Sequence, residues 1–206
     1  MDFKNSDTVP GPRAEDHLPQ TAQAAVKIVI VGGFGVGKTT MVGSVSEIRP
    51  LTTEETMTEA GVGIDDNYGS DSKTATTVAM DFGRISITER LVLYLFGTPG
   101  QERFWFLWNG LFEGALGAVV LVDTRRLDVS FDAVGRLEER GVPFVVAVNS
   151  FPDGPRHPIE ELRAALDLSP EIPIVECDAR RRASSRDVLM TLMRFLHSLA
   201  MQGVLA

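Results

Sequence analysis

The sequence contains a single cysteine, Cys177, so it cannot form an internal disulfide, which suits a reducing compartment. It has no apolar run of transmembrane length, no signal-peptide pattern and no lipidation motif. Basic residues are in deficit: 20 Lys and Arg against 28 Asp and Glu give a net charge of −8. Nucleic acid and anionic lipid are therefore poor partners. We expect a cytoplasmic protein without a direct membrane anchor, recruited to a membrane only through a partner.

The first 24 residues differ from the rest of the chain. They are polar and contain three prolines, so they cannot bury enough apolar surface to offset the entropy lost on ordering. The sequence predicts a disordered tail over residues 1–24 and a single domain over residues 25–206, a length that suits one sizeable core.

Strand and helix signals alternate from residue 25 onward. The stretch 51–75 has little periodicity and is expected to be a long functional loop. The second and third predicted strands form an antiparallel hairpin. The alternation predicts a three-layer α/β fold with a mostly parallel six-stranded sheet and one antiparallel edge strand. The predicted strands are 25–31, 76–87, 90–96, 114–123, 142–149 and 171–178, and the predicted helices are 38–48, 102–113, 130–140, 158–167 and 184–201.

A phosphate-binding loop follows the first strand. The segment "GGFGVGKT" (32–39) spells G-x-x-x-x-G-K-[ST] and opens a helix, which is the context that the motif requires. Its backbone N–H groups are expected to face phosphates, Lys38 to contact the terminal phosphates and Thr39 to ligate Mg²⁺. The predicted nucleotide-binding residues here are Gly32, Gly33, Phe34, Gly35, Val36, Gly37, Lys38, Thr39 and Thr40.

Three segments, "AVKIVIVGGFGVGKTT", "TTVAMDF" and "LFGTPGQERF", together resemble the Ras-like small GTPases over about residues 25–200. The resemblance implies a P-loop NTPase fold that binds GTP or GDP with Mg²⁺. It implies that Thr77 contacts the metal and the γ-phosphate, that Gly100 binds nucleotide, and that Gln101 orients the attacking water while Lys38 holds charge.

The phrases "VGGFGVGKTT" and "LFGTPGQERFWF" are similar to bacterial MglA-type GTPases and to the conservon GTPases of actinobacteria. This narrower resemblance implies a small roadblock-type partner, as a dimer, and a sensor-kinase-like protein as a second partner.

One departure from the family pattern concerns the metal. Gly97 stands where the family carries a magnesium-binding aspartate. Thr39, phosphate oxygens and waters are sufficient ligands for Mg²⁺. Asp81 is expected to be an ordinary solvated or turn-facing strand residue, with a supporting carboxylate near the metal as the alternative. Asp123 ends an apolar strand and is expected to be structural; if it bound metal instead, the chain would be an ATPase or kinase of another class.

A second departure concerns the base-recognition motif N-K-x-D, which here is "NSFPD". Asn149 is in place, Ser150 replaces the lysine, Pro152 occupies the aspartate position and Asp153 follows one residue late. A carboxylate that accepts both guanine N1–H and N2–H explains guanine preference. In "ECDAR", the residues Asp178, Ala179 and Arg180 match the third base motif: Ala179 would offer its N–H to the base and Arg180 would stack on it, the alternative being an ordinary strand end with a basic loop.

Several aromatic residues lie near the expected switch. Phe34 either crowds the γ-phosphate side of the loop or turns into a local apolar contact. After Gln101, positions 104, 107, 108, 111 and 115 form a helical stripe typical of a core face. Trp105, Phe106 and Phe112 fall outside it and are predicted to form a partner-binding surface, the alternative being a wide buried face.

The sequence thus favours a slow GTP-hydrolysing switch. Two alternatives stay open at this point: a nucleotide-binding adaptor with little or no turnover, and an ATP-preferring P-loop protein.

Overall fold

The computed structural model describes residues 23–57, 76–100 and 108–204. Nearly all of the predicted tail, the loop over 58–75 and the segment 101–107 lie outside these residues. The elements are β1 (Ala24–Val31), α1 (Lys38–Val45), β2 (Leu51–Met57), β3 (Thr76–Ser86), β4 (Leu91–Gly97), α2 (Trp108–Phe112), β5 (Ala115–Val122), η3 (Leu127–Ser130), α3 (Phe131–Glu139), β6 (Phe144–Asn149), α4 (Ile159–Ala165), β7 (Ile174–Cys177) and α5 (Arg182–Met201).

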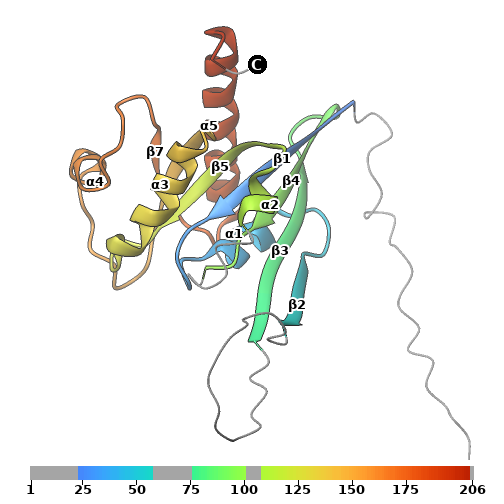
Figure 1. Ribbon diagram of the computed structural model, residues 1–206, viewed down its shortest axis with the longest axis horizontal. Coiled ribbons are helices and arrows are strands. Elements are labelled where there is room, and N and C mark those ends of the chain that lie inside the picture. The colour runs from blue at the N-terminus through green and yellow to red at the C-terminus, as the bar shows by residue number, and fades with distance from the viewer. Residues whose placement is uncertain (1–22, 58–75, 101–107, 205–206) are drawn as a thin grey trace, which may run out of the picture.

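These strands form one sheet in the order β2-β3-β4-β1-β5-β6-β7 (Figure 1). The pairs of β1 with β4 and β5, of β5 with β6, and of β6 with β7 are parallel, while β3 is antiparallel to both neighbours. The predicted α/β P-loop fold and the β3–β4 hairpin are confirmed. The sheet gains a seventh strand, because residues 51–57 pair with β3 at its edge, and the prediction of a loop over these residues was wrong.

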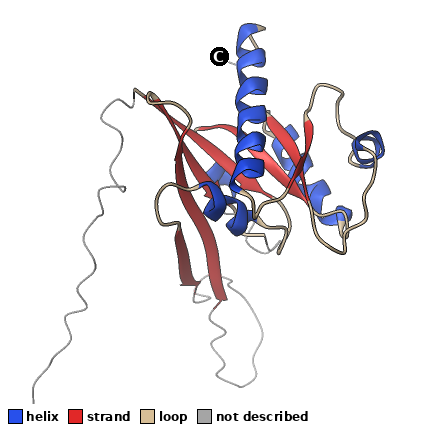
Figure 2. Cartoon of the chain, turned by 180° about the vertical axis from the view of Figure 1, so that it is seen from behind, coloured by secondary structure: helices blue, strands red, loops and turns tan. Residues whose placement is uncertain are grey.

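The core has two halves, one on each face of the sheet. Along β1 the residues alternate: Ile28 and Ile30 belong to one hydrophobic cluster, and Val29 and Val31 to the other. Helices α1 and α5 cover the first face, and α2 and α3 cover the second (Figures 1 and 2). Because both faces are covered, the central strands are apolar on both sides, as is typical of parallel sheets.

The ends of the parallel strands determine where chemistry is possible. In an open parallel sheet, ligands bind outside the carboxyl ends of the strands. At this edge the chain continues from β1 into the glycine-rich loop, from β4 into residues 98–100, from β6 into residues 150–158, and from β7 into residues 178–180. These segments carry the phosphate-loop, switch and base motifs, which therefore begin at one edge. No helix among the described residues is long and apolar enough to cross a membrane.

Candidate functional site: a phosphate loop with a displaced carboxylate

The loop between β1 and α1 depends on glycine at three positions. Gly32, Gly35 and Gly37 have φ values of 140°, 77° and 107°, a region that residues with side chains rarely adopt. A Cβ at Gly32 would also lie 2.4 Å from the carbonyl oxygen of Leu121 in β5. The loop is therefore folded tightly against the sheet, and α1 begins at Lys38 directly after it.

Lys38 is turned back over this loop. Its Nζ donates to the carbonyl oxygens of Gly32 (2.9 Å) and Gly33 (2.7 Å), and the residue is 7% exposed. Burial lowers the pKa of Lys38 to about 8, and the nearby charge of Asp81 opposes that effect. Its positive charge is thus poorly solvated at the place where the motif expects the terminal phosphates.

Thr39, Asp81 and Gly97 meet beside Lys38. The hydroxyl of Thr39 donates to Oδ2 of Asp81 at 2.6 Å, and Asp81 is only 5% exposed. Asp81 in β3 pairs directly with Gly97 in β4. A Cβ at Gly97 would lie 3.0 Å from both Cβ and Oδ2 of Asp81. The carboxyl group of Asp81 therefore occupies the space next to Gly97, and the expectation that Asp81 is an ordinary strand residue was wrong.

The donor set fits a magnesium ion. Mg²⁺ prefers oxygen ligands, keeps several waters and binds proteins through one or two carboxylates together with substrate phosphates. Thr39 and Asp81 offer a hydroxyl and a buried carboxylate, 2.6 Å apart, next to the phosphate loop. Among the described residues there is no cluster of three His, Cys, Asp or Glu side chains that would suggest another metal site.

The chain after β4 lies against the loop. A Cβ at Gly100 would lie 2.6 Å from Lys38 Nζ and 2.8 Å from the backbone nitrogen of Phe34, so only glycine fits here. The preceding residue is held from the other side, because the indole Nε1 of Trp108 donates to the carbonyl oxygen of Pro99 at 3.1 Å.

These groups enclose a cavity of about 250 Å³. It brings together most of the residues predicted from the phosphate-loop motif and the switch, and adds Asp81 and Thr98 to them. The lining residues are Phe34, Gly35, Gly37, Lys38, Thr39, Thr40, Asp81, Thr98 and Gly100.

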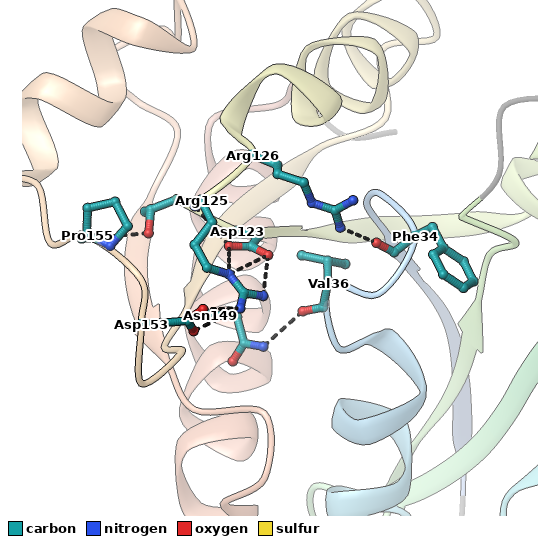
Figure 3. Close-up of polar contacts among 9 residues, drawn as sticks. Phe34, Val36, Asp123, Arg125, Arg126, Asn149, Asp153 and Pro155 are labelled. Carbon is teal, nitrogen blue, oxygen red and sulfur yellow. Dashed lines mark hydrogen bonds and ion pairs between the residues drawn. The ribbon is translucent and has the colours of Figure 1, made fainter.

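Asn149 connects the phosphate loop to the third base motif. Its Nδ2 donates to the carbonyl oxygen of Val36 at 2.9 Å (Figure 3). Its Oδ1 accepts from the N–H of Ala179, also at 2.9 Å. The structure thus brings Asn149 and Ala179 together, as the motifs predict. The N–H of Ala179, which was expected to face a base, donates to Asn149 instead.

Asp153, Asp178 and Arg180 of the base motifs all form ion pairs. Arg180 forms a fork with Asp178 (2.8 and 3.0 Å), and its side chain is 61% exposed, so its stacking on a base stays a prediction. Asp153 accepts from Nη1 of Arg125 at 2.9 Å, and its side chain is 71% exposed. It lies in a turn in which the N–H of Gly154 donates to the carbonyl oxygen of Phe151.

Asp123 is structural in this arrangement. It is fully buried, and Arg125 donates to both of its oxygens through Nε (2.9 Å) and Nη2 (2.8 Å). The hydrogen bond from Arg125 holds the pKa of Asp123 below its ordinary value. The interpretation of Asp123 as a structural aspartate agrees with these contacts.

The remaining predicted residues divide into three groups. Thr77 lies in β3, four residues before Asp81, so roughly 13 Å of strand separates their Cα atoms and a metal contact by Thr77 requires a different arrangement of this strand. Gln101, Trp105 and Phe106 lie outside the described residues. Phe112 was predicted to belong to a partner-binding surface, and this prediction was wrong. It is 6% exposed and packs edge-on against Trp108, because a wide apolar face of the helix is buried.

Phe34 is 65% exposed, so it is not turned into a local apolar contact. Its carbonyl oxygen accepts from Nη2 of Arg126 at 2.6 Å (Figure 3). Arg125 and Arg126 belong to no motif and were missed in the sequence. Only their position indicated a role, since they follow Asp123 and Thr124 just after the carboxyl end of β5, which lies between the motif-bearing strands β1 and β6.

The fold and this site define an α/β P-loop nucleotide-binding protein. The chain belongs to the family described as conserved hypothetical ATP binding proteins, which it matches over residues 30–198.

Among curated proteins it is similar to an uncharacterised protein of Methanocaldococcus jannaschii, at 27% identity over 60% of this chain and 69% of the relative. It is also similar to the Ras-related protein Rab-11C of Dictyostelium discoideum (26% identity, 84% of this chain, 68% of the relative) and to the Ras-related protein RABA3 of Arabidopsis thaliana (31% identity, 59% of this chain, 44% of the relative).

Proposed function

We propose that the protein is a magnesium-dependent switch that binds GTP and GDP, hydrolyses GTP slowly, and binds a partner in one nucleotide state. The observation that carries this proposal is the contact between Thr39 and the buried carboxylate of Asp81, beside Lys38 and against Gly97. It supplies, from β3, the carboxylate that the switch segment lacks.

In this mechanism the loop N–H groups and Lys38 hold the phosphates. Lys38 exchanges its bonds to Gly32 and Gly33 for bonds to phosphate oxygens. Thr39 and Asp81 hold Mg²⁺, which neutralises charge on the phosphate oxygens when it is bound. Gln101 orients the attacking water. Gly100 lines the cavity beside Lys38 and Phe34, so a bound γ-phosphate would meet the segment that leads to Gln101, which is how the nucleotide would alter the switch.

Guanine preference rests on Asn149, Asp153 and Ala179, which stand in the order that the resemblance implies. The test is calorimetry of GDP, GTP, ADP and ATP, each with Mg²⁺ and with EDTA. Guanine nucleotides should bind more tightly than adenine nucleotides, and Mg²⁺ should strengthen triphosphate binding. Equal affinities for GTP and ATP would refute the guanine assignment and leave the phosphate site standing.

A second candidate is a nucleotide-binding adaptor with little turnover and with either base preference. The close contact of Gly100 with the phosphate loop favours it, since it narrows the γ-phosphate side of the cavity. Single-turnover hydrolysis of GTP and ATP separates the two candidates: a rate that depends on Gln101 supports the switch, and no release of phosphate over hours supports the adaptor.

The partner that we propose is a small roadblock-type dimer that docks near Trp105 and Phe106, together with a sensor-kinase-like protein. Both aromatics follow closely on Gln101, so a change at Gln101 can move them. Titration of a purified roadblock-type protein against the GDP-loaded and the non-hydrolysable-GTP-loaded chain tests this, with Trp105→Ala as the variant. Equal binding of the roadblock-type protein to wild type and Trp105→Ala, each loaded with GDP or with non-hydrolysable GTP, would refute this docking site.

A further inference from the structure

Side chains hold the carbonyl groups of the phosphate loop in place. Nη2 of Arg126 donates to the carbonyl oxygen of Phe34 at 2.6 Å, and Nδ2 of Asn149 donates to that of Val36 at 2.9 Å (Figure 3). Lys38 holds two carbonyl oxygens earlier in the loop, but in the proposed mechanism it exchanges these bonds for bonds to phosphate oxygens. Arg126 and Asn149 can therefore keep holding the loop after a phosphate binds.

The connection that carries Arg126 is fixed both to the sheet and to the loop. A turn closes it directly after β5, in which the N–H of Arg126 donates to the carbonyl oxygen of Asp123 at 3.0 Å. The following η3 helix packs against the same loop, since a Cβ at Gly33 would lie 2.7 Å from Cγ2 of Val129. The guanidinium of Arg126 thus reaches the loop from a fixed base, although its side chain is exposed.

The contact with Arg126 controls the peptide between Phe34 and Gly35. The carbonyl oxygen of Phe34 and the N–H of Gly35 belong to one planar unit and point in opposite directions. Gly35 has a φ of 77°, and glycine adopts positive and negative φ about equally readily, so this peptide can turn over unless it is held. With its carbonyl oxygen on Arg126, the peptide turns its N–H away from Arg126, and both of its residues line the phosphate cavity.

We propose that Arg126 is a positioning residue for phosphate binding: by holding the carbonyl oxygen of Phe34, it keeps the N–H of Gly35 directed at the phosphates. The reverse orientation would present a carbonyl oxygen to an anion, whereas a loop of this kind binds phosphate through backbone N–H groups. The contact is short and charge-assisted, which is the stronger form of a hydrogen bond. The inference rests on the phosphate-binding part of the proposed function and not on its preference for guanine.

The test compares wild type, Arg126→Gln and Arg126→Lys by calorimetry in Mg²⁺, with inorganic pyrophosphate, GDP and ADP as the ligands. Glutamine is too short to reach Phe34, so Arg126→Gln should weaken all three ligands alike, on the order of tenfold. Lysine is nearly as long as arginine and also donates, so Arg126→Lys should recover most of the affinity. Arg194→Gln is the matched control, because it removes the same charge from an exposed position on α5, and it should bind like the wild type.

Two readouts separate positioning from simple attraction between Arg126 and the phosphates. In about 1 M salt, charges separated by more than about 3 Å are screened. The affinity ratio of wild type to Arg126→Gln should persist there if Arg126 positions the peptide, and fall to one if it only attracts. In protein labelled with ¹⁵N-glycine, the tightest of the three ligands should shift the Gly35 amide proton downfield. That shift should be smaller in Arg126→Gln and unchanged in Arg194→Gln.

The outcomes distinguish the role of Arg126 from the proposed function. Arg126 is exposed, so Arg126→Gln should keep the circular dichroism and the unfolding midpoint of the wild type. Wild-type affinity for pyrophosphate in this variant, or an affinity ratio of one in high salt, would overturn the positioning role. A wild type that binds GDP and ADP equally would instead contradict guanine preference and leave the effect on pyrophosphate standing. A wild type that binds none of the three ligands would overturn both.

Discussion

The buried amine of Lys38 makes nucleotide binding depend on pH. Its pKa is lowered from 10.5 to about 8, chiefly by burial. This difference corresponds to about 3 kcal/mol by which the ligand-free protein disfavours the charged amine relative to the unfolded chain. A bound phosphate reverses the preference, because an opposite charge within a few ångströms favours the ammonium form.

For the ligand-free protein, the lowered pKa of Lys38 predicts that stability increases as the pH rises. Below about pH 8 both folded and unfolded chains carry the proton, and the full penalty is present. Between pH 8 and 10.5 the folded chain releases it first, so the contribution of Lys38 to the free energy of unfolding rises by about 3 kcal/mol. Chemical denaturation of wild type and Lys38→Met across this range measures the difference, and Lys38→Met should lack the rise.

For binding, the same pKa predicts proton uptake. At pH 8.5 roughly three-quarters of Lys38 is neutral in the ligand-free protein, so triphosphate binding should take up about three-quarters of a proton, against almost none at pH 7. Calorimetry in buffers of different ionisation enthalpy measures this number. Lys27→Met, which removes a lysine on β1 outside the site, should keep the uptake. Equal proton uptake at pH 7 and 8.5 in the wild type would refute the reasoning.

Three further variants test separate contacts. Gly100→Ala should weaken triphosphate binding on the order of tenfold or more, because its Cβ would lie 2.8 Å from the backbone nitrogen and Cα of Phe34 in the phosphate loop; Gly110→Ala, whose Cβ meets nothing within 4 Å, should leave binding unchanged. Asn149→Ala should lower the free energy of unfolding by about 2 kcal/mol, because it removes the partners of Val36 and Ala179; denaturant melts measure this, and no loss would contradict the bridging role. Trp108→Ala should lower the free energy of unfolding by about 3–5 kcal/mol in the same assay, because Trp108 is 1% exposed. A loss below about 1 kcal/mol would mean that Trp108 does not pack in the hydrophobic core.

Much of the fold was predictable because its signals are local. The strand–glycine–helix context of Lys38, the apolar strands and the order of the motifs all depend on short stretches of sequence. Strand β2 was missed because "LTTEETM" is polar and lacks apolar alternation, and only pairing with β3 defines it. Phe112 was misassigned because a narrow stripe was assumed for the helix, whereas the buried face includes it.

The decisive features of the site were harder to predict from the sequence, because they depend on contacts between residues that are far apart along the chain. Asp81 meets Gly97 only through the register of the β3–β4 hairpin. Both strands of that hairpin were predicted, but their apolar patterns do not specify which residue of one strand pairs with which residue of the other. Arg125 reaches Asp153 across two neighbouring strand ends, and no spacing rule connects residues 28 positions apart.

The central claim is that Asp81 supplies the carboxylate that Gly97 does not. Gly97 does not have a positive φ, so an aspartate here is crowded by the Asp81 side chain and not strained by the backbone conformation. Three variants address this: Asp81→Ala, Gly97→Asp, and the double variant that moves the carboxylate from β3 to β4. The measurement is the ratio of GTP affinities with Mg²⁺ and with EDTA.

Asp81→Ala should lose most of the magnesium effect, on the order of tenfold, since a charged ligand is removed. Gly97→Asp alone should be poorly folded or bind weakly, because its Cβ would lie 3.0 Å from Asp81 and two carboxylates would share one space. The double variant should recover the magnesium effect at least in part. A full magnesium effect in Asp81→Ala, or a double variant no better than either single one, would contradict the account.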